Sequence, residues 1–234
     1  MKNFSNLLKI GVLSFLIGGC CAGSGLVQRS MNENASPEIQ NKIQIEKLRQ
    51  ITVAITEDTL GISFPTCTGI WVDKNLILTA AHCVEDKLLI SYSIANEYNK
   101  DIVRTASVLK IDKKIDLALL TTYADGIDHP IAILSSDVIS TGDQVHVLGH
   151  PVSYAWSYTK GYVAAIRPDV PGPGDMGKIE KILQVSAPIG LGNSGGGAFD
   201  SQGKLIGICS WISKMGPNLS FFIHRDVIEK FLKE

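Results

Sequence analysis

The sequence has almost no excess of either charge sign. Its 22 lysines and arginines are balanced by 23 aspartates and glutamates, which gives a formal net charge of -1. Proteins that bind nucleic acid concentrate positive charge against the phosphate backbone, and this chain carries no such footprint. Hydrophobic residues make up 45% of the chain and charged residues 19%, a balance that also excludes the intrinsically disordered class. We therefore expect a folded domain with a sizeable core.

The apolar run near the N-terminus is too short to span a bilayer as a helix. Lys2 and Lys9 precede an apolar run over residues 10–19, which is about half of the roughly 20 residues that a spanning helix needs. A basic flank followed by a short apolar run is typical of a secretory signal peptide. We therefore assign residues 1–20 to a signal peptide and expect the protein to be exported.

The end of that run resembles a bacterial lipobox. Residues 16–20 read Leu-Ile-Gly-Gly-Cys, although Gly18 departs from the usual pattern at the second position before the cysteine. The resemblance implies lipidation of Cys20 and a membrane-anchored protein in the cell envelope. Ordinary cleavage near Ala22, which would give a secreted protein, and an uncleaved anchor remain the alternatives.

A polar segment separates this anchor from the folded part. Residues 21–36 are rich in glycine, serine, asparagine and glutamine. Ser36-Pro37-Glu38 is typical of a helix N-terminus, and the apolar spacing predicts a helix to about Arg49. We assign residues 21–45 to a tether and residues 46–234 to one folded domain.

The remainder of the chain is patterned as β-structure. The 22 glycines and nine prolines are spread among short Val/Ile-rich runs, for example residues 51–55, 76–79 and 144–148, which predicts an all-β fold. No internal repeat or second linker follows residue 50. Helical spacing of apolar residues predicts a short closing helix over residues 225–232.

Three segments beside strand-like runs carry histidine, aspartate and serine in that order. They are Thr-Ala-Ala-His-Cys at 79–83, Asp-Leu-Ala-Leu-Leu at 116–120 and Gly-Asn-Ser-Gly-Gly at 192–196. Together they resemble the trypsin-like (chymotrypsin-fold) serine peptidases over about residues 50–232. Gly149-His150-Pro151 and the form of the serine motif are most similar to bacterial HtrA-like and glutamyl-endopeptidase-like members.

The resemblance implies two packed antiparallel six-stranded β-barrels, over about residues 50–125 and 130–224, with the active site in the cleft between them. It implies a catalytic triad of His82, Asp116 and Ser194. A serine hydroxyl is a poor nucleophile at neutral pH, so an imidazole must take its proton during attack. The aspartate fixes the tautomer of that imidazole and stabilises the imidazolium.

The glycine-rich serine segment predicts an oxyanion hole. Gly192, Asn193 and Ser194 form this loop, in which the amides of Gly192 and Ser194 converge on the oxygen of the tetrahedral intermediate. Asn193 stands where zymogen-type members carry an aspartate that pairs with a newly released amino terminus. We therefore expect no activation of that kind.

Two of the five cysteines flank the histidine motif. Cys67 precedes His82 by 15 residues and Cys83 follows it directly, a spacing that matches a disulfide of the family. Such a bridge requires an oxidising compartment, and two free buried cysteines are the alternative. Cys209 lies in a predicted strand and is expected to be a buried thiol.

The resemblance also implies which residues bind the substrate. Ser210, Trp211 and Ile212 match the strand that pairs with an extended polypeptide, and Pro188 matches the floor of the specificity pocket, with Ser220 beside it. No carboxylate is placed to receive lysine or arginine. We therefore predict cleavage after small or medium aliphatic residues.

Two other groups of residues have spacings typical of other sites, but their surroundings do not fit. Gly-x-Ser-x-Gly also suits an α/β-hydrolase, with Asp200 and His224 as triad partners, but that fold needs a helix directly after the serine, and here a strand follows. His146 and His150 have a spacing that suits zinc on a helix, but they lie in an alternating strand pattern. No metal or cofactor is expected.

The sequence therefore predicts a serine endopeptidase that works through an acyl-enzyme on extended polypeptides. The alternative from another class is an inert envelope scaffold of the same fold that binds peptides without cutting them. The chain ends soon after the closing helix, so we expect no PDZ domain. The sequence specifies no oligomeric state.

Overall fold

The computed structural model describes residues 37–59, 62–95, 104–123, 128–213 and 219–234. The chain divides into two compact units, residues 1–40 and 41–234, and of the first unit only residues 37–40 are described. The predicted signal peptide, the lipidation site Cys20 and the polar segment up to residue 36 lie outside the described residues. Within the described ranges, no helix combines the length and the apolar character that crossing a membrane requires.

The predicted first helix is present as α2 (Pro37–Ile51) and extends two residues beyond the expected end at Arg49. Its last turn is held by the core, because Leu48 and Ile51 are buried. Thr52, the first residue of the following strand, donates its hydroxyl to the Leu48 carbonyl at 2.7 Å. This bond satisfies one of the carbonyls that a helix end leaves without an intrahelical partner.

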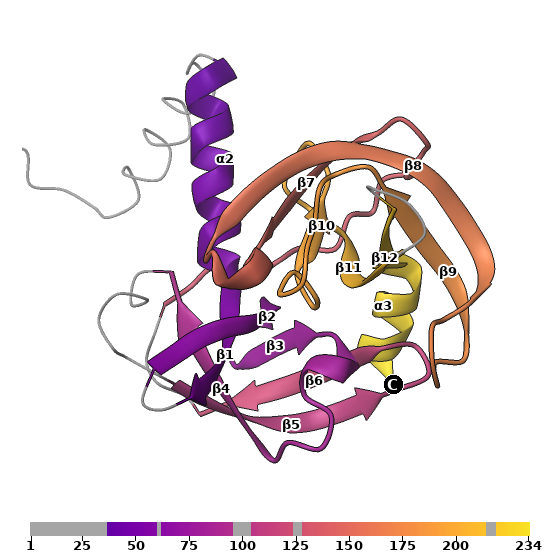
Figure 1. The fold of residues 1–234 in the computed structure, drawn as a ribbon. Coiled ribbons are helices and arrows are strands. Elements are labelled where there is room, and N and C mark those ends of the chain that lie inside the picture. The colour runs from indigo at the N-terminus through magenta and orange to yellow at the C-terminus, as the bar shows by residue number, and fades with distance from the viewer. Residues whose placement is uncertain (1–36, 60–61, 96–103, 124–127, 214–218) are drawn as a thin grey trace, which may run out of the picture. The chain divides into compact units, whose positions relative to one another are not determined.

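The first barrel contains six antiparallel strands and closes on itself in the order β1-β2-β3-β6-β5-β4 (Figure 1). Closure gives each of the six strands a pairing partner on both sides, so the first and last strands of the sheet also pair with each other. Its strands are β1 (Thr52–Thr59), β2 (Ile62–Asp73), β3 (Leu76–Thr79), β4 (Leu89–Ile94), β5 (Arg104–Asp112) and β6 (Leu117–Thr122).

The second barrel is also closed, in the order β10-β11-β12-β9-β8-β7. Helix α3 (Arg225–Lys233) follows its last strand directly, and His224 accepts a hydrogen bond from the Asp226 amide as the N-cap. The strands are β7 (Gln144–Gly149), β8 (Ser157–Pro171), β9 (Lys178–Val185), β10 (Gly197–Phe199), β11 (Leu205–Ile212) and β12 (Ser220–His224).

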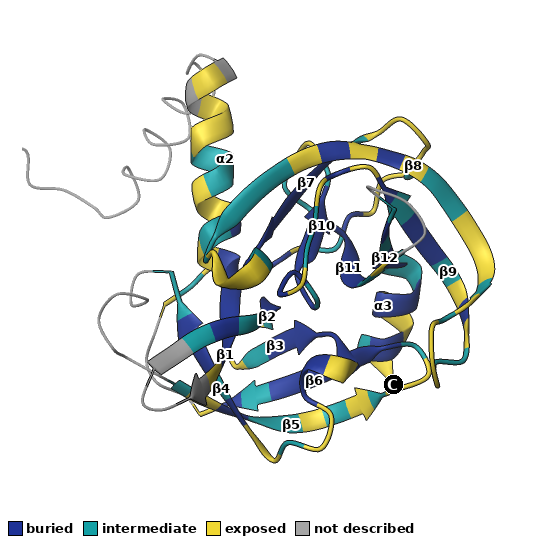
Figure 2. Ribbon diagram, in the orientation of Figure 1, coloured by how far each residue is buried: buried dark blue, intermediate teal, exposed yellow. Residues whose placement is uncertain are grey.

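The buried apolar residues form three clusters. One fills the first barrel around Trp71 and Tyr92, and one fills the second barrel around Val163 and Phe222. The third contains residues of both barrels and of both helices, including Phe199. Figure 2 shows buried residues on strands of both barrels and on helix α3. The third cluster holds the two barrels together, so residues at the ends of their strands meet at a fixed place. The predicted all-β fold with two six-stranded barrels and a short closing helix is confirmed.

Candidate active site

His82 lies in a short 3-10 helix, η1 (Ala81–Cys83), which begins two residues after β3 ends. Ala81 and Cys83 are buried on either side of it, whereas the His82 side chain is 39% exposed. The backbone is therefore fixed by the core of the first barrel while the imidazole remains accessible to a substrate.

Asp116 approaches the histidine from the turn before β6. Its backbone is left-handed, with φ of 57°, a conformation that aspartate adopts more readily than most residues. Asp116 is only 1% exposed. Its Oδ1 accepts a hydrogen bond from the His82 amide at 3.0 Å and lies 2.9 Å from His82 Nδ1, with Oδ2 at 3.0 Å from the same nitrogen. Both the backbone and the ring of His82 are thus tied to one carboxylate.

This contact sets the protonation of the imidazole. The hydrogen bond to the Asp116 carboxylate raises the pKa of His82 above its ordinary value, burial opposes that effect, and the charges of Asp116 and Glu85 raise it further. Because the carboxylate can only accept, Nδ1 carries the proton and Nε2 of the neutral ring is left as the base. This is the tautomer that a general base toward Ser194 needs.

Ser210 supports Asp116 from the second barrel. The register between β11 and β12 shifts between Cys209 and Trp211, so Ser210 lies at a β-bulge, and its buried hydroxyl donates to Asp116 Oδ2. A bulge redirects a side chain out of the regular alternation. The sequence prediction assigned Ser210 only to substrate binding. Its bond to Asp116 spans 94 positions, and no local pattern indicates it.

Ser194 lies in the loop before β10 and is half-buried. Thr68 of β2 donates its amide to the Ser194 carbonyl at 2.8 Å, which ties the loop that carries Ser194 to the first barrel. Among the described residues, no hydrogen bond joins Ser194 Oγ to His82. Contacts of this kind are often long without substrate and shorten when it binds.

The two peptide units that contain the Gly192 and Ser194 amides are each anchored through their carbonyl oxygens. The Leu191 carbonyl accepts from the Val152 amide at 2.7 Å, and the Asn193 carbonyl accepts from the Gly196 amide at 2.8 Å. Since a trans peptide holds its N–H opposite its C=O, these bonds fix the directions of the Gly192 and Ser194 N–H groups. Neither N–H has an acceptor among the described residues. Two oriented and uncommitted donors are what an oxyanion hole requires.

The conformation of this loop requires glycine at position 192. Its φ is +98°, and a Cβ there would lie 2.3 Å from the His150 carbonyl oxygen. A side chain would both strain the backbone and force the loop away from the β7–β8 connection.

The structure joins Cys67 and Cys83 in a disulfide that links β2 to the helical turn carrying His82. Cys83 Sγ lies 3.6 Å from the Ser194 carbonyl oxygen, a packing contact because a disulfide sulfur has no proton to donate. The ligand atoms of Cys67, His82 and Cys83 all lie within 4.8 Å of one another. Because both sulfurs are in the bridge, the group offers no thiolate and does not fit a metal.

Of the predicted substrate-binding residues, Ser210 is bonded to Asp116. Trp211 is half-buried and stacks on Phe221 with ring centroids 5.2 Å apart, and the neighbouring Ile212 is 40% exposed. The buried hydroxyl of Ser220 donates to the Ala187 carbonyl at 3.2 Å, and Pro188 is exposed. Residues 214–218, which follow the Trp211 segment, lie outside the described ranges.

The residues with the spacings of an α/β-hydrolase triad and of a zinc site have separate structural roles. Asp200 accepts from the amides of Gln202 and Lys204 in the β10–β11 turn, and His224 caps helix α3. His146 Nδ1 lies 2.7 Å from the hydroxyl of Tyr158, whereas His150 Nδ1 bonds Thr68. Cys209 is a buried free thiol, as predicted, and burial raises its pKa.

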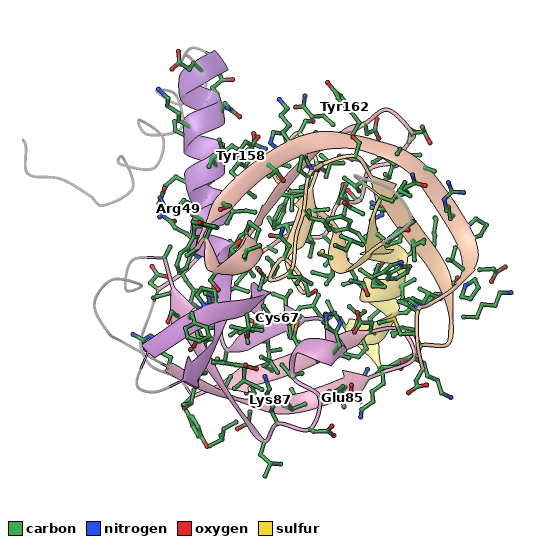
Figure 3. The ribbon with its side chains drawn as sticks, in the orientation of Figure 1. Arg49, Cys67, Glu85, Lys87, Tyr158 and Tyr162 are labelled. Carbon is green, nitrogen blue, oxygen red and sulfur yellow. A yellow bond between two sulfur atoms is a disulfide. The ribbon has the colours of Figure 1, made fainter. Side chains whose placement is uncertain are left out.

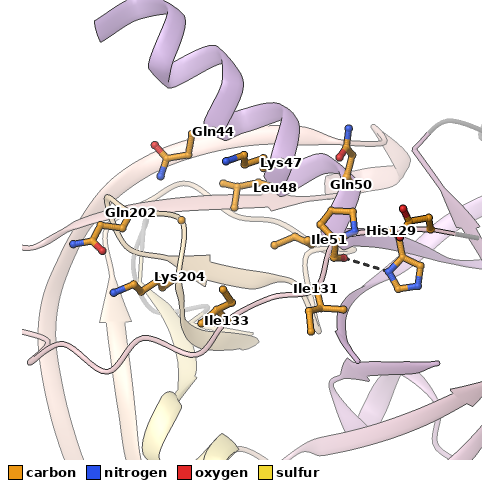
Figure 4. A pocket seen from close by; sticks show the side chains of 13 residues that line it. Gln44, Lys47, Leu48, Gln50, Ile51, His129, Ile131, Ile133, Gln202 and Lys204 are labelled. Atoms are coloured by element: carbon orange, nitrogen blue, oxygen red, sulfur yellow. Dashed lines mark hydrogen bonds between the residues drawn. The ribbon is translucent and has the colours of Figure 1, made fainter. Parts of the chain in front are cut away.

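A cavity of about 740 Å³ lies elsewhere, between the end of helix α2, the segment 128–133 and the β10–β11 turn (Figure 4). Leu48, Ile51, Ile131 and Ile133 line it together with polar side chains. None of the predicted triad residues lines this cavity. Figure 3 shows Cys67, which belongs to β2 of the first barrel, apart from Arg49 near the end of helix α2.

Two closed six-stranded barrels joined along one buried cluster, with an aspartate–histidine pair and a glycine-rich serine loop at the junction, define a chymotrypsin-type fold. Residues 67–208 match the family described as trypsin-like peptidase domain, so the chain belongs to this family. A curated relative, "Serine protease HtrA-like" of Staphylococcus aureus (strain MRSA252), is 33% identical over 171 residues. That match covers 69% of this chain and 22% of the relative, so this chain spans about a fifth of the length of the curated relatives it matches.

Solved structures share the fold. The HtrA-type protease AlgW with tripeptide has a TM-score of 0.69 at 23% identity, covering 81% of this chain and 61% of that chain. The active form of the Rv3671c protease from M. tuberculosis has a TM-score of 0.69 at 19% identity, covering 85% of this chain and 86% of that chain. The predicted resemblance to HtrA-like trypsin-type serine peptidases is confirmed.

Proposed function

We propose that this chain is a serine endopeptidase that cuts extended polypeptides through an acyl-enzyme on Ser194. The observation that carries the proposal is the His82–Asp116 pair, in which a nearly inaccessible carboxylate accepts from both the amide and the ring of one histidine at 2.9–3.0 Å. A surface ion pair has no need of such orientation. A general base needs it, because the free ring nitrogen must face the nucleophile.

Acylation proceeds by proton transfer coupled to attack. Ser194 Oγ forms a bond to the carbonyl carbon of the substrate while its proton passes to His82 Nε2. The imidazolium is stabilised by Asp116, whose charge is held by the Ser210 hydroxyl. The same proton then passes to the leaving amine as the peptide C–N bond breaks, which leaves Ser194 esterified.

The oxyanion of the tetrahedral intermediate is stabilised by the amides of Gly192 and Ser194. These N–H groups are free of other acceptors among the described residues, and their directions are fixed from behind by bonds to Leu191 O and Asn193 O. Donors that need no reorientation during the reaction contribute most to such stabilisation, and loss of one typically lowers turnover by on the order of 10² to 10³.

Deacylation repeats the sequence with water. His82 Nε2 takes a proton from a water molecule as the water oxygen attacks the ester carbonyl. The proton then returns to Ser194 Oγ as the ester bond breaks, which releases a carboxylic acid and regenerates the enzyme.

We propose substrates that lie as an extended strand along Ser210–Ile212, with a small or medium aliphatic residue at the cleaved bond. The support is chemical, since Pro188 and Ile212 offer apolar surface and no carboxylate is assigned to the pocket. A profiling library with positional amino-acid mixtures tests this. Selection for Arg, Lys or Glu before the cut bond would overturn it.

The experiment that tests the activity is labelling of the purified protein with a fluorophosphonate, with Ser194→Ala as the control. We expect labelling of the wild-type chain and none of the variant. Absence of Ser194-dependent labelling in correctly folded protein would instead favour an inert peptide-binding scaffold.

We propose further that the chain is exported and held at a membrane by lipid on Cys20, with secretion as the alternative. The basic flank, the short apolar run and the lipobox-like residues 16–20 support this. Metabolic labelling with an alkyne fatty acid tests it. Incorporation that is lost in Cys20→Ser supports the anchor, and equal labelling of both chains refutes it.

A further inference from the structure

Three buried groups from distant parts of the chain meet behind the loop that carries Ser194. They are the Thr68 hydroxyl of β2, the His150 ring directly after β7, and the carbonyl of Gly192. Thr68 Oγ1 lies 2.7 Å from the Gly192 carbonyl oxygen and 2.9 Å from His150 Nδ1. Thr68 and His150 are both 0% exposed.

The direction of these hydrogen bonds follows from proton counting. A carbonyl can only accept, so the single hydroxyl proton of Thr68 is donated to Gly192 O. The contact with His150 must then be donated by the ring from Nδ1–H to Thr68 Oγ1. Burial lowers the pKa of His150 to about 3, so its ring is neutral and has one N–H. Both bonds form only if that proton is on Nδ1.

The second ring nitrogen of His150, Nε2, makes no contact that would explain why a histidine stands at this position. Nε2 of His150 is buried and has no hydrogen-bond partner in the part of the chain that the structure describes. A buried polar atom without a partner costs free energy that an apolar side chain would avoid. The His150 ring also packs edge-on against the Trp156 ring, with the two ring centroids 4.8 Å apart. An apolar ring could make this contact equally well. What an apolar residue could not supply is the Nδ1–H donor.

The acceptor at the end of this relay is the central peptide of the oxyanion loop. The Gly192 carbonyl belongs to the same planar unit as the Asn193 amide, which donates to Gly190 O at 3.1 Å. Rotation of this unit would turn the two neighbouring N–H groups, those of Gly192 and Ser194. The Thr68 bond is therefore in the position to keep both donors aimed at one point.

The segment that carries His150 is itself held in an unfavourable backbone conformation. Val152, Ser153 and Trp156 have φ of 48°, 65° and 52°. A β-branched residue in that region is a clear outlier, and such conformations persist only where surrounding contacts fix them. Val152 donates its amide to Leu191 O, so this segment holds the oxyanion loop through its backbone as well.

We propose that His150 and Thr68 are positioning residues for the oxyanion hole: His150 orients the Thr68 hydroxyl, and that hydroxyl holds the Gly192–Asn193 peptide. Neither residue touches substrate. The proposal rests on the proposed peptidase function. It adds a chain of two hydrogen bonds, from His150 to Thr68 and from Thr68 to the Gly192 carbonyl, that positions the backbone of the oxyanion hole.

Two matched pairs of variants test the relay by peptide-cleavage kinetics. Thr68→Val removes the hydroxyl at nearly constant shape, and we expect kcat to fall by about 10-fold with KM within about twofold, because the oxyanion donors act in the transition state. Thr68→Ser retains the hydroxyl and should stay near wild type. His150→Leu should lower kcat several-fold, and His150→Asn should recover part of it, since its amide nitrogen can donate near the place of Nδ1.

A double-mutant cycle separates the relay from independent packing effects. If His150 acts through Thr68, the variant with both Thr68→Val and His150→Leu should match Thr68→Val alone. Affinity for a boronic acid that mimics the tetrahedral intermediate should fall in parallel with kcat. The proposal is overturned if folded Thr68→Val keeps the wild-type kcat. It is also overturned if the losses of kcat in the two single variants multiply in the double variant, or if His150→Asn and His150→Leu have the same kcat.

A spectroscopic readout needs no activity. Two-bond ¹H–¹⁵N spectra of the wild-type chain labelled with ¹⁵N-histidine report which ring nitrogen carries the proton. We expect Nδ1–H at His150 from pH 5 to 8, and Nε2–H would overturn the relay. If wild-type protein shows no Ser194-dependent cleavage, the peptidase function fails, while this measurement still decides the hydrogen-bond arrangement.

Discussion

Reduction of the Cys67–Cys83 bridge should lower the thermal unfolding midpoint by a calculable amount. The bridge joins residues separated by 16 positions, and closing a loop of that size contributes about 3 kcal/mol in the chain-entropy model. For domains of 150–250 residues, 1 kcal/mol shifts the midpoint by roughly 2–4 °C. We therefore expect a fall of roughly 6–12 °C. Reduction leaves the side chains otherwise unchanged, so this comparison avoids the loss of packing that a substitution would add.

The assay is calorimetry of the wild-type protein with and without reductant, with free thiols counted to show that the bridge has opened. Cys209→Ala serves as the matched control and should retain the full shift, because Cys209 is a free cysteine outside the bridge. The double variant Cys67→Ala/Cys83→Ala should not respond to reductant. A wild-type midpoint that moves by less than about 2 °C after complete reduction would refute the reasoning.

Three further predictions concern the catalytic centre. The hydrogen bond to Asp116 raises the pKa of His82, and the neutral ring is the base, so kcat/KM should rise with pH through a midpoint above the ordinary pKa of histidine. Glu85→Gln removes a charge that raises this pKa and should move the midpoint down, and an unmoved pH profile would contradict this. Gly192→Ala should abolish most cleavage because of its φ of +98° and the 2.3 Å clash, whereas Gly190→Ala, whose added Cβ has no neighbour closer than 3.6 Å, should cleave nearly as wild type in the same kinetic assay. Ser210→Ala should lower the free energy of unfolding by about 1.5–3 kcal/mol, the range for a hydrogen bond to a charged group, while Ser210→Thr retains the hydroxyl; equal denaturant midpoints for the two variants would exclude this role.

Much of the fold could be predicted because its determinants are local. The alternating runs and the glycine and proline punctuation indicated β-structure, and the helical spacing near the C-terminus predicted α3 (Arg225–Lys233) to within one residue. The end of helix α2 was predicted two residues early, because the burial of Ile51 against the core extends the helix beyond its last local signal.

The candidate site divides in the same way. His82, Asp116 and Ser194 stand in short motifs that could be read in sequence, and the structure brings the first two into direct contact. The support from Ser210 could not be predicted, since its hydroxyl reaches the carboxylate only because a register shift turns it out of the strand. Thr68 carried no signal beyond its place next to Cys67.

The sequence by itself determined which chemical groups are present and in what order: a histidine, an aspartate and a serine in glycine-rich or strand-like surroundings, and cysteines on either side of the histidine. Only the tertiary structure decided how these groups are oriented. The hydrogen bond between His150 and Thr68 spans 82 positions, and the one between Thr68 and Gly192 spans 124. Each therefore depends on closure of both barrels and on the core between them. Hydrogen bonds require directions within tens of degrees, and spacing along a chain cannot specify such directions between distant strands.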